Sequence, residues 1–284
     1  MTELAEAAAS PAGGPMRPVL YRVASTTQET GATVTMTLEA EGEAVPPIAP
    51  GQFNMLWSWG VGEAPISVSA TTPDGSLIHT IRDVGGVTGA LCAKEAGEVV
   101  GVRGPFGRGW DVESARGCDV VIVAGGIGLA PLRPVVHATL AERSAFGSVS
   151  LVVGARTSEE LLFRSELDGW WHDGNITVRT IVDRGSDDWQ GNVGIVTNEL
   201  PRVAVQPGRT VALVCGPEVM MRFVALHLVD RGVAPDRIQV SLERNMQCAI
   251  AHCGHCQLAG SFVCADGPVV TWEAAEPLLE VREL

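Results

Sequence analysis

Alternating hydrophobic and polar residues dominate the first hundred positions of the chain. Residues 33–39 alternate with period two, which places Val34, Met36 and Leu38 on one face of a predicted strand. Turns rich in Pro, Gly and Asp separate this run from further short apolar segments. These further predicted strands span residues 52–57, 66–70, 77–84 and 98–103. Short strands at this spacing predict a small antiparallel β-barrel over residues 17–114.

The pattern changes after Cys118. Residues 119–124 form a continuous apolar run, typical of a strand buried on both faces, and a helical pattern follows at 130–143. Strands and helices then alternate, with strands expected at 148–154, 176–183, 210–215 and 238–242 and helices at 159–167 and 218–231. This order predicts an α/β domain over 115–242 with a parallel five-stranded sheet between layers of helices.

Composition and charge narrow the classes of function. The net charge of −13 argues against a nucleic-acid partner, because phosphate binding needs a basic face. No membrane span is predicted, since the most apolar run, 120–131, is short and broken by glycines. Residues 1–16 are rich in Ala, Gly and Pro and lack the apolar core of a signal peptide. We therefore predict a disordered tail at 1–16 and a cytoplasmic protein.

Four of the seven cysteines lie close together in the last segment, residues 243–284. Cys248, Cys253 and Cys256 have the spacing C-x4-C-x2-C, and Cys264 follows. This is the plant-type [2Fe–2S] spacing, and the small residues between the cysteines let the chain fold tightly around a cluster. Four thiolates also suit a structural zinc ion, or the thiols carry no metal at all. The segment is predicted to be a small iron–sulfur arm, with zinc as the alternative.

Glycines follow the first predicted parallel strand. Gly125, Gly126 and Gly128 stand where that strand passes into a helix, so that backbone amides and the helix N-terminus can meet a pyrophosphate. The fourth parallel strand ends in a similar turn, Cys215-Gly216. A tight turn without a ligand is the alternative for each pattern taken in isolation. Together they favour a nicotinamide-nucleotide site at the carboxyl edge of the sheet.

Three segments of the barrel are candidates for holding a flavin. Ser67 can hydrogen-bond an isoalloxazine nitrogen, Arg82 ends a predicted strand, and Gly86 and Thr88 open a short helix where a diphosphate can sit. The run 104–107, Gly-Pro-Phe-Gly, then closes the barrel. Strand serines, a helix N-cap at Thr88 and a β-turn are the alternatives for these positions.

The order of these motifs resembles the ferredoxin–NADP⁺ reductase superfamily. With the cysteine motif added, the chain looks like the γ subunit of cytosolic NiFe hydrogenases and the electron-transfer subunit of dihydroorotate dehydrogenase. The resemblance covers residues 19–268 and rests on P-I-S at 65–67, G-x-T at 86–88, G-P-x-G at 104–107, G-G-x-G-x-A-P at 125–131 and C-G-P at 215–217. The family's R-x-Y-S is replaced here by Ala64 to Ser67, so the arginine that binds a flavin phosphate is missing.

The resemblance implies a set of cofactor contacts. FAD is expected on Pro65, Ile66 and Ser67, with its pyrophosphate near Arg82, Gly86 and Thr88. The nicotinamide cofactor, NADP(H) or NAD(H), is expected on Gly125, Gly126, Gly128, Cys215 and Gly216, and the [2Fe–2S] cluster on Cys248, Cys253, Cys256 and Cys264. Ser67 and Cys215 are expected beside the reacting atoms, and the alternative for Cys215 is a thiol packed in the core. Arg156 and Arg184 follow strands and can pair with a 2′-phosphate, or they are ordinary surface arginines.

These parts together predict an electron-transfer chain. A flavin takes a hydride as two electrons and releases them singly to a cluster, so the chain is expected to be the diaphorase subunit of a multi-subunit cytosolic NiFe hydrogenase. Its expected partners are other subunits and a soluble nicotinamide nucleotide. The alternatives are the same role for dihydroorotate dehydrogenase, and a non-enzymatic zinc-binding module on a reductase-like shell.

Overall fold

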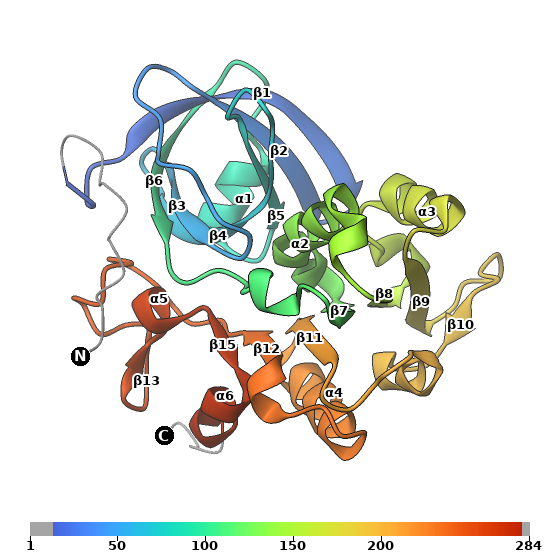
Figure 1. Cartoon of the computed structure of the whole chain (residues 1–284). Helices are drawn as coiled ribbons and strands as arrows, with labels where there is room; N and C mark the ends of the chain where they lie inside the picture. The colour runs from blue at the N-terminus through green and yellow to red at the C-terminus, as the bar shows by residue number, and fades with distance from the viewer. Residues whose placement is uncertain (1–13, 280–284) are drawn as a thin grey trace.

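The structure is a computed structural model that describes residues 14–279. A β-barrel, an α/β domain and a C-terminal segment lie against one another (Figure 1). The predicted disordered tail therefore falls outside the described residues except for its last three positions.

Six antiparallel strands close the barrel in the order β1-β2-β5-β4-β3-β6. They are β1 (Val19–Thr30), β2 (Thr33–Ala40), β3 (Phe53–Ser58), β4 (Gly62–Thr71), β5 (Leu77–Arg82) and β6 (Val99–Phe106). The alternation in β2 is confirmed, because Met36 and Leu38 are fully buried in the barrel core. Leu91 of helix α1 (Gly86–Cys92) joins the same core. The barrel prediction is thus correct, although β1 was not expected as a separate strand.

The second sheet has seven strands in the order β10-β9-β8-β7-β11-β12-β15. They are β7 (Asp119–Gly125), β8 (Val149–Thr157), β9 (Thr177–Arg184), β10 (Asn192–Val193), β11 (Thr210–Cys215), β12 (Ile238–Ser241) and β15 (Val269–Thr271). All five predicted parallel strands are present. The sheet is larger than predicted because two-residue β10 extends one edge and antiparallel β15 extends the other. Such short strands carry too little periodicity to be read from sequence.

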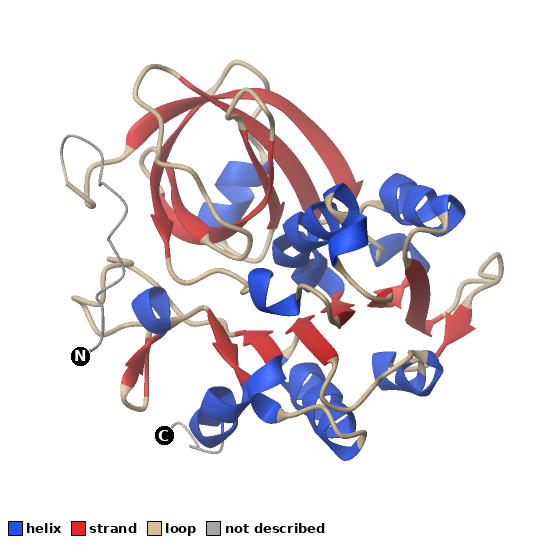
Figure 2. Cartoon of the chain, in the orientation of Figure 1, coloured by secondary structure: helices blue, strands red, loops and turns tan. Residues whose placement is uncertain are grey.

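Helices cover both faces of this sheet, as predicted (Figure 2). Helices α2 (Leu129–Ala141) and α3 (Arg164–Asp173) pack into the core on one face, and α4 (Glu218–Asp230) and α6 (Trp272–Leu279) into the core on the other. The helix expected at 159–167 was wrong in position. Phe163, with a φ of 52°, separates a short 3₁₀ turn from α3, so the helix begins five residues later than expected.

The strand order reverses at β7. This strand lies between β8 and β11. The chain first adds β8, β9 and β10 on one side of β7, and then adds β11 and β12 on its other side. Ligands of open α/β sheets bind at the carboxyl ends of strands at such a point. The glycine turn after β7 and the turn after β11 both lie there.

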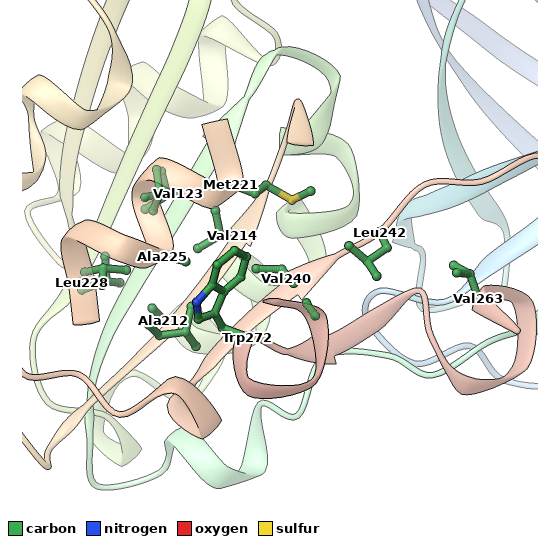
Figure 3. Packing of buried hydrophobic residues seen from close by; sticks show 14 of the residues in the cluster. Val123, Ala212, Val214, Met221, Ala225, Leu228, Val240, Leu242, Val263 and Trp272 are labelled. Carbon is green, nitrogen blue, oxygen red and sulfur yellow. The ribbon is translucent and has the colours of Figure 1, made fainter. Parts of the chain in front are cut away.

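The C-terminal segment consists of hairpin strands β13 (Gln257–Leu258) and β14 (Ser261–Phe262), helix α5 (Val263–Asp266), β15 and α6. Its last part returns to the α/β domain, since β15 pairs with β12. Trp272 is only 1% exposed, and Figure 3 shows its indole among Val214, Val240 and Ala225. The cysteine loop is therefore not an independent arm, because the chain on both of its sides is anchored in the sheet.

Trp110 joins the barrel to the α/β domain. Its indole nitrogen donates to the carbonyl of Pro131 in α2 at 2.9 Å, and its backbone nitrogen donates to the carbonyl of Pro50 at 2.8 Å. A Cβ on Gly51 would lie 2.6 Å from its ring, so only glycine fits beside it. Within the described residues, no helix combines the length and apolarity needed to cross a bilayer.

Candidate functional site

A cavity of about 530 Å³ opens at the point where the strand order reverses. Its wall includes Arg82 from the barrel, Gly125 at the end of β7 with Gly126 after it, Arg156 near the end of β8 and Gly216 after β11. Five residues predicted separately from the sequence are thus brought together around one space. The cavity also spans the junction between the barrel and the α/β domain.

Other predicted residues do not line this cavity. Gly128 is buried, and a Cβ there would collide with the carbonyl oxygen of Cys215, so this glycine serves close packing of α2 against β11. Arg184 is exposed at the end of β9, whereas its neighbour Asp183 does line the cavity. Arg156 is therefore the better placed of the two arginines predicted for a 2′-phosphate.

Arg82 forms an ion pair across the domain boundary. Its guanidinium lies 3.1 Å from the carboxylate of Glu160, in the turn between β8 and α3. Both side chains are about one-third exposed, so solvent screening keeps the pair to a small contribution to stability. An anionic ligand in the cavity would compete with Glu160 for the same arginine.

The loop before α1 has room for a ligand group. A Cβ added at Gly85 or Gly86 would meet no other atom within 4 Å, and both residues are exposed. The hydroxyl of Thr88 accepts from the backbone nitrogen of Val84 at 3.0 Å and donates to the carbonyl of Gly85 at 3.1 Å. Thr88 thus holds the shape of the loop, and the helix N-cap is Gly85 rather than Thr88.

Ser67 is held from inside the barrel by a histidine that the sequence reasoning missed. Nδ1 of His79 lies 3.0 Å from the carbonyl oxygen of Ser67, and Nε2 lies 3.2 Å from the amide nitrogen of Asn54. Burial lowers the pKa of His79 to about 4, so the ring is neutral at pH 7. It donates from Nδ1 to the carbonyl and accepts at Nε2 from the amide. The signal available in the sequence was a histidine placed between apolar residues of a predicted strand.

Cys215 ends β11, and Glu243 stands two residues after the end of the neighbouring strand β12. Burial raises the pKa of the Cys215 thiol to about 12, and the charge of Glu243 adds to the shift. Cys215 is therefore a neutral thiol at pH 7. Glu243 lines the cavity, and neighbouring protein atoms around its carboxyl raise its pKa, although the residue as a whole is exposed. Glu243 is not among the residues predicted from the sequence, although it directly follows the last predicted parallel strand.

The cysteine loop directs backbone N–H groups at sulfur. Sγ of Cys248 accepts from the backbone nitrogens of His252 and Cys253 at 3.3 Å and of Ile250 at 3.5 Å. Sγ of Cys264 accepts from Ala251 at 3.2 Å. Such donors stabilise negative charge on sulfur.

The same loop brings two of its cysteines together and contains strained backbone positions. Sγ of Cys256 lies 3.1 Å from Sγ of Cys264. Ala249 and Ala251 have φ values of 62° and 55°, a left-handed conformation that residues other than glycine rarely adopt. Within residues 14–279, no three His, Cys, Asp or Glu side chains have the geometry of a single-metal site. The chemistry of this donor set, four nearby thiols of which Cys248 and Cys264 accept backbone N–H groups, fits a sulfur-bridged cluster.

Known proteins are similar to this chain in sequence and in fold. The oxidoreductase NAD-binding domain family matches residues 122–226. Sulfhydrogenase 2 subunit gamma of Pyrococcus furiosus is 33% identical over 243 residues, which are 79% of this chain and 84% of that protein. The probable dihydroorotate dehydrogenase B (NAD(+)), electron transfer subunit, of Methanothermobacter thermautotrophicus is 39% identical over 240 residues, 83% of this chain and 82% of that protein.

A solved structure extends the match to nearly the whole chain. The NADH-dependent reduced ferredoxin–NADP oxidoreductase, studied for flavin-based electron bifurcation, is similar with a TM-score of 0.73 and 25% identity, covering 94% of this chain and 93% of that one. The resemblance predicted from the motif order is confirmed. The chain belongs to the ferredoxin–NADP⁺ reductase-like oxidoreductases, in the group that includes sulfhydrogenase gamma subunits and dihydroorotate dehydrogenase electron-transfer subunits.

Proposed function

We propose that this chain is the electron-transfer subunit of a multi-subunit cytoplasmic NiFe hydrogenase, working with NAD(P)H, FAD and a [2Fe–2S] cluster. The observation that carries the proposal is the cysteine loop, whose backbone N–H groups converge on Cys248 and Cys264 beside a reductase-like barrel. An uncharged structural loop has no need for four N–H donors aimed at sulfur. The cluster ligands in this proposal are Cys248, Cys253, Cys256 and Cys264.

The nicotinamide nucleotide is proposed to bind in the cavity at the reversal of strand order. Gly126 leaves the backbone open to a pyrophosphate just before α2, where the helix dipole favours negative charge, and Gly125 lines the same cavity against Met220. Arg156 is the candidate partner for a 2′-phosphate. Asp183 and Glu160 line the same cavity as Arg156, and their carboxylates suit the hydroxyls of NAD(H). The lining therefore suits NAD(H) as well as NADP(H).

FAD is proposed to lie along Pro65, Ile66 and Ser67, with its pyrophosphate near Arg82 and the open loop at Gly86. When bound, the flavin accepts a hydride and passes its electrons on singly. His79 keeps the carbonyl of Ser67 in place and, being neutral, would add no charge next to a bound flavin. Because no arginine stands at Ala64, Arg82 is the side chain left to neutralise the phosphates.

Dihydroorotate dehydrogenase is the second candidate for the complex that this subunit serves. The 39% identity with a probable electron-transfer subunit of that enzyme favours it. The electron donor that the whole complex oxidises distinguishes the two candidates. We expect the complex isolated from its native host to reduce NAD(P)⁺ with hydrogen, and reduction with dihydroorotate instead would establish the alternative.

Anaerobic purification tests the cofactors themselves. We expect flavin absorption, about two iron atoms and two labile sulfides per chain, and bleaching of the flavin by NADH or NADPH. Cys253→Ser should lower the iron content and keep the bleaching, whereas the matched control Cys118→Ser, on the linker before β7, should change neither. A colourless wild-type protein that contains zinc would overturn the proposal in favour of a binding module.

A further inference from the structure

A buried arginine connects the barrel to the cysteine loop. Arg103, on β6, has a side chain that is only 2% exposed. Burying a guanidinium is costly unless every donor is paired. Its carboxylate partner is Glu63 at the start of β4, which receives Nε at 2.9 Å and Nη2 at 2.6 Å. This two-pronged geometry fixes the plane of the guanidinium as well as neutralising it.

The remaining donors of Arg103 point out of the barrel. Nη2 donates to the carbonyl of Gln247 at 3.0 Å, and Nη1 donates to the carbonyls of Cys248 at 3.2 Å and Pro15 at 2.8 Å. All five N–H groups of the guanidinium therefore have an acceptor. One residue thus ties together the chain before β1, the barrel and the first cysteine of the loop.

The contact with Cys248 orients the loop that follows it. In a trans peptide the C=O and the next N–H point in opposite directions. Fixing the carbonyl of Cys248 against Arg103 therefore fixes the direction of the chain into Ala249, whose left-handed φ of 62° is unfavourable by itself. Surrounding contacts must hold such a conformation, and Arg103 supplies two of them from the barrel side.

Glu63 carries this connection to the flavin side. It lies on β4 two residues before Pro65, the first of the residues proposed to contact FAD, and β4 pairs with β3, which pairs with β6. The pair Arg103–Glu63 thus bridges across β3 and joins the flavin strand to the cysteine loop through side chains alone.

We propose that Arg103, held by Glu63, is a positioning residue that sets the placement of the cluster relative to the flavin. This inference rests on the proposed function. In that function a bound flavin would take the hydride of NAD(P)H and a bound cluster would accept its two electrons singly for the partner subunit, with the proton released to solvent as the flavin is reoxidised. Arg103 governs the flavin-to-cluster step and leaves the hydride step to the cavity residues.

The test compares Arg103→Lys, Arg103→Met and Glu63→Gln with wild type in rapid-mixing experiments with NADH and NADPH. We expect flavin reduction to stay within about twofold, and cluster reduction to slow by about ten- to a hundredfold in Arg103→Met, as for a reacting group displaced by about 1 Å. The electron paramagnetic resonance signal of the reduced cluster should also shift. Arg103→Lys and Glu63→Gln should give intermediate values, because each keeps part of the contact.

Arg22→Met is the matched control, since Arg22 also pairs with a glutamate on the barrel but is about half exposed. It should behave as wild type. Loss of iron from Arg103→Met with FAD retained would also support the proposal, because it shows the loop released. An unchanged signal and cluster-reduction rate in Arg103→Met, or joint loss of FAD and iron in all three variants, would overturn it. If wild type itself holds no cluster, the proposed function has failed instead.

Discussion

Replacing His79 should remove a distinct pH dependence of stability. The ring is fully buried between Asn54 and Ser67, and desolvation lowers its pKa from 6.5 to about 4 in the folded protein. The unfolded chain regains the ordinary value and binds more protons between these two limits. The contribution of His79 to the free energy of unfolding is therefore fully present above pH 6.5, and it is lost as the pH drops from 6.5 toward 4.

The size of the effect follows from the shift. A difference of about 2.5 pKa units corresponds to about 3 kcal/mol in the free energy of unfolding. Urea unfolding of wild type and His79→Gln at pH 7 and pH 4 measures it as a difference between the two proteins. Wild type should lose about 3 kcal/mol more than the variant over this range.

An exposed histidine provides the control for this experiment. His172, on α3, is exposed, and His172→Gln should lose the same stability as wild type over the same pH range. Equal losses in wild type and His79→Gln would refute the reasoning. Nuclear magnetic resonance gives an independent check, because a folded protein in which the His79 ring titrates near pH 6.5 would contradict a buried neutral imidazole.

Two further predictions concern packing. Gly128→Ala should lower the free energy of unfolding by about 1–3 kcal/mol, because the new methyl group meets the backbone of Cys215. The control Gly169→Ala, in open space on α3, should raise the unfolding midpoint slightly. A Gly128→Ala midpoint equal to that of wild type would count against the close contact. Trp272→Ala should lower the free energy of unfolding by about 3–5 kcal/mol. Trp171→Ala, which removes a side chain that is 63% exposed, should lower it by less than about 0.5 kcal/mol. Similar losses of unfolding free energy for both variants in chemical denaturation would contradict the core position of Trp272.

The cavity shows where sequence reasoning succeeded and where it stopped. Gly125, Gly126 and Gly216 were predicted because glycine at the end of a strand lets the backbone turn and approach a ligand closely. All three line the cavity. Glu243 and His79 were missed. A glutamate or a histidine has many ordinary positions, and only the folded chain brings one to a cavity wall and the other behind Ser67.

The sequence by itself determined the local elements, because periodicity, turn residues and cysteine spacing act over a few neighbouring positions. It was enough to establish the barrel, the five parallel strands and the family. Only the tertiary structure decided that β15 pairs with β12 and that Arg103 reaches Cys248, 145 residues away. Such contacts depend on strand order and burial, which join distant parts of the chain and leave no repeating pattern in the sequence.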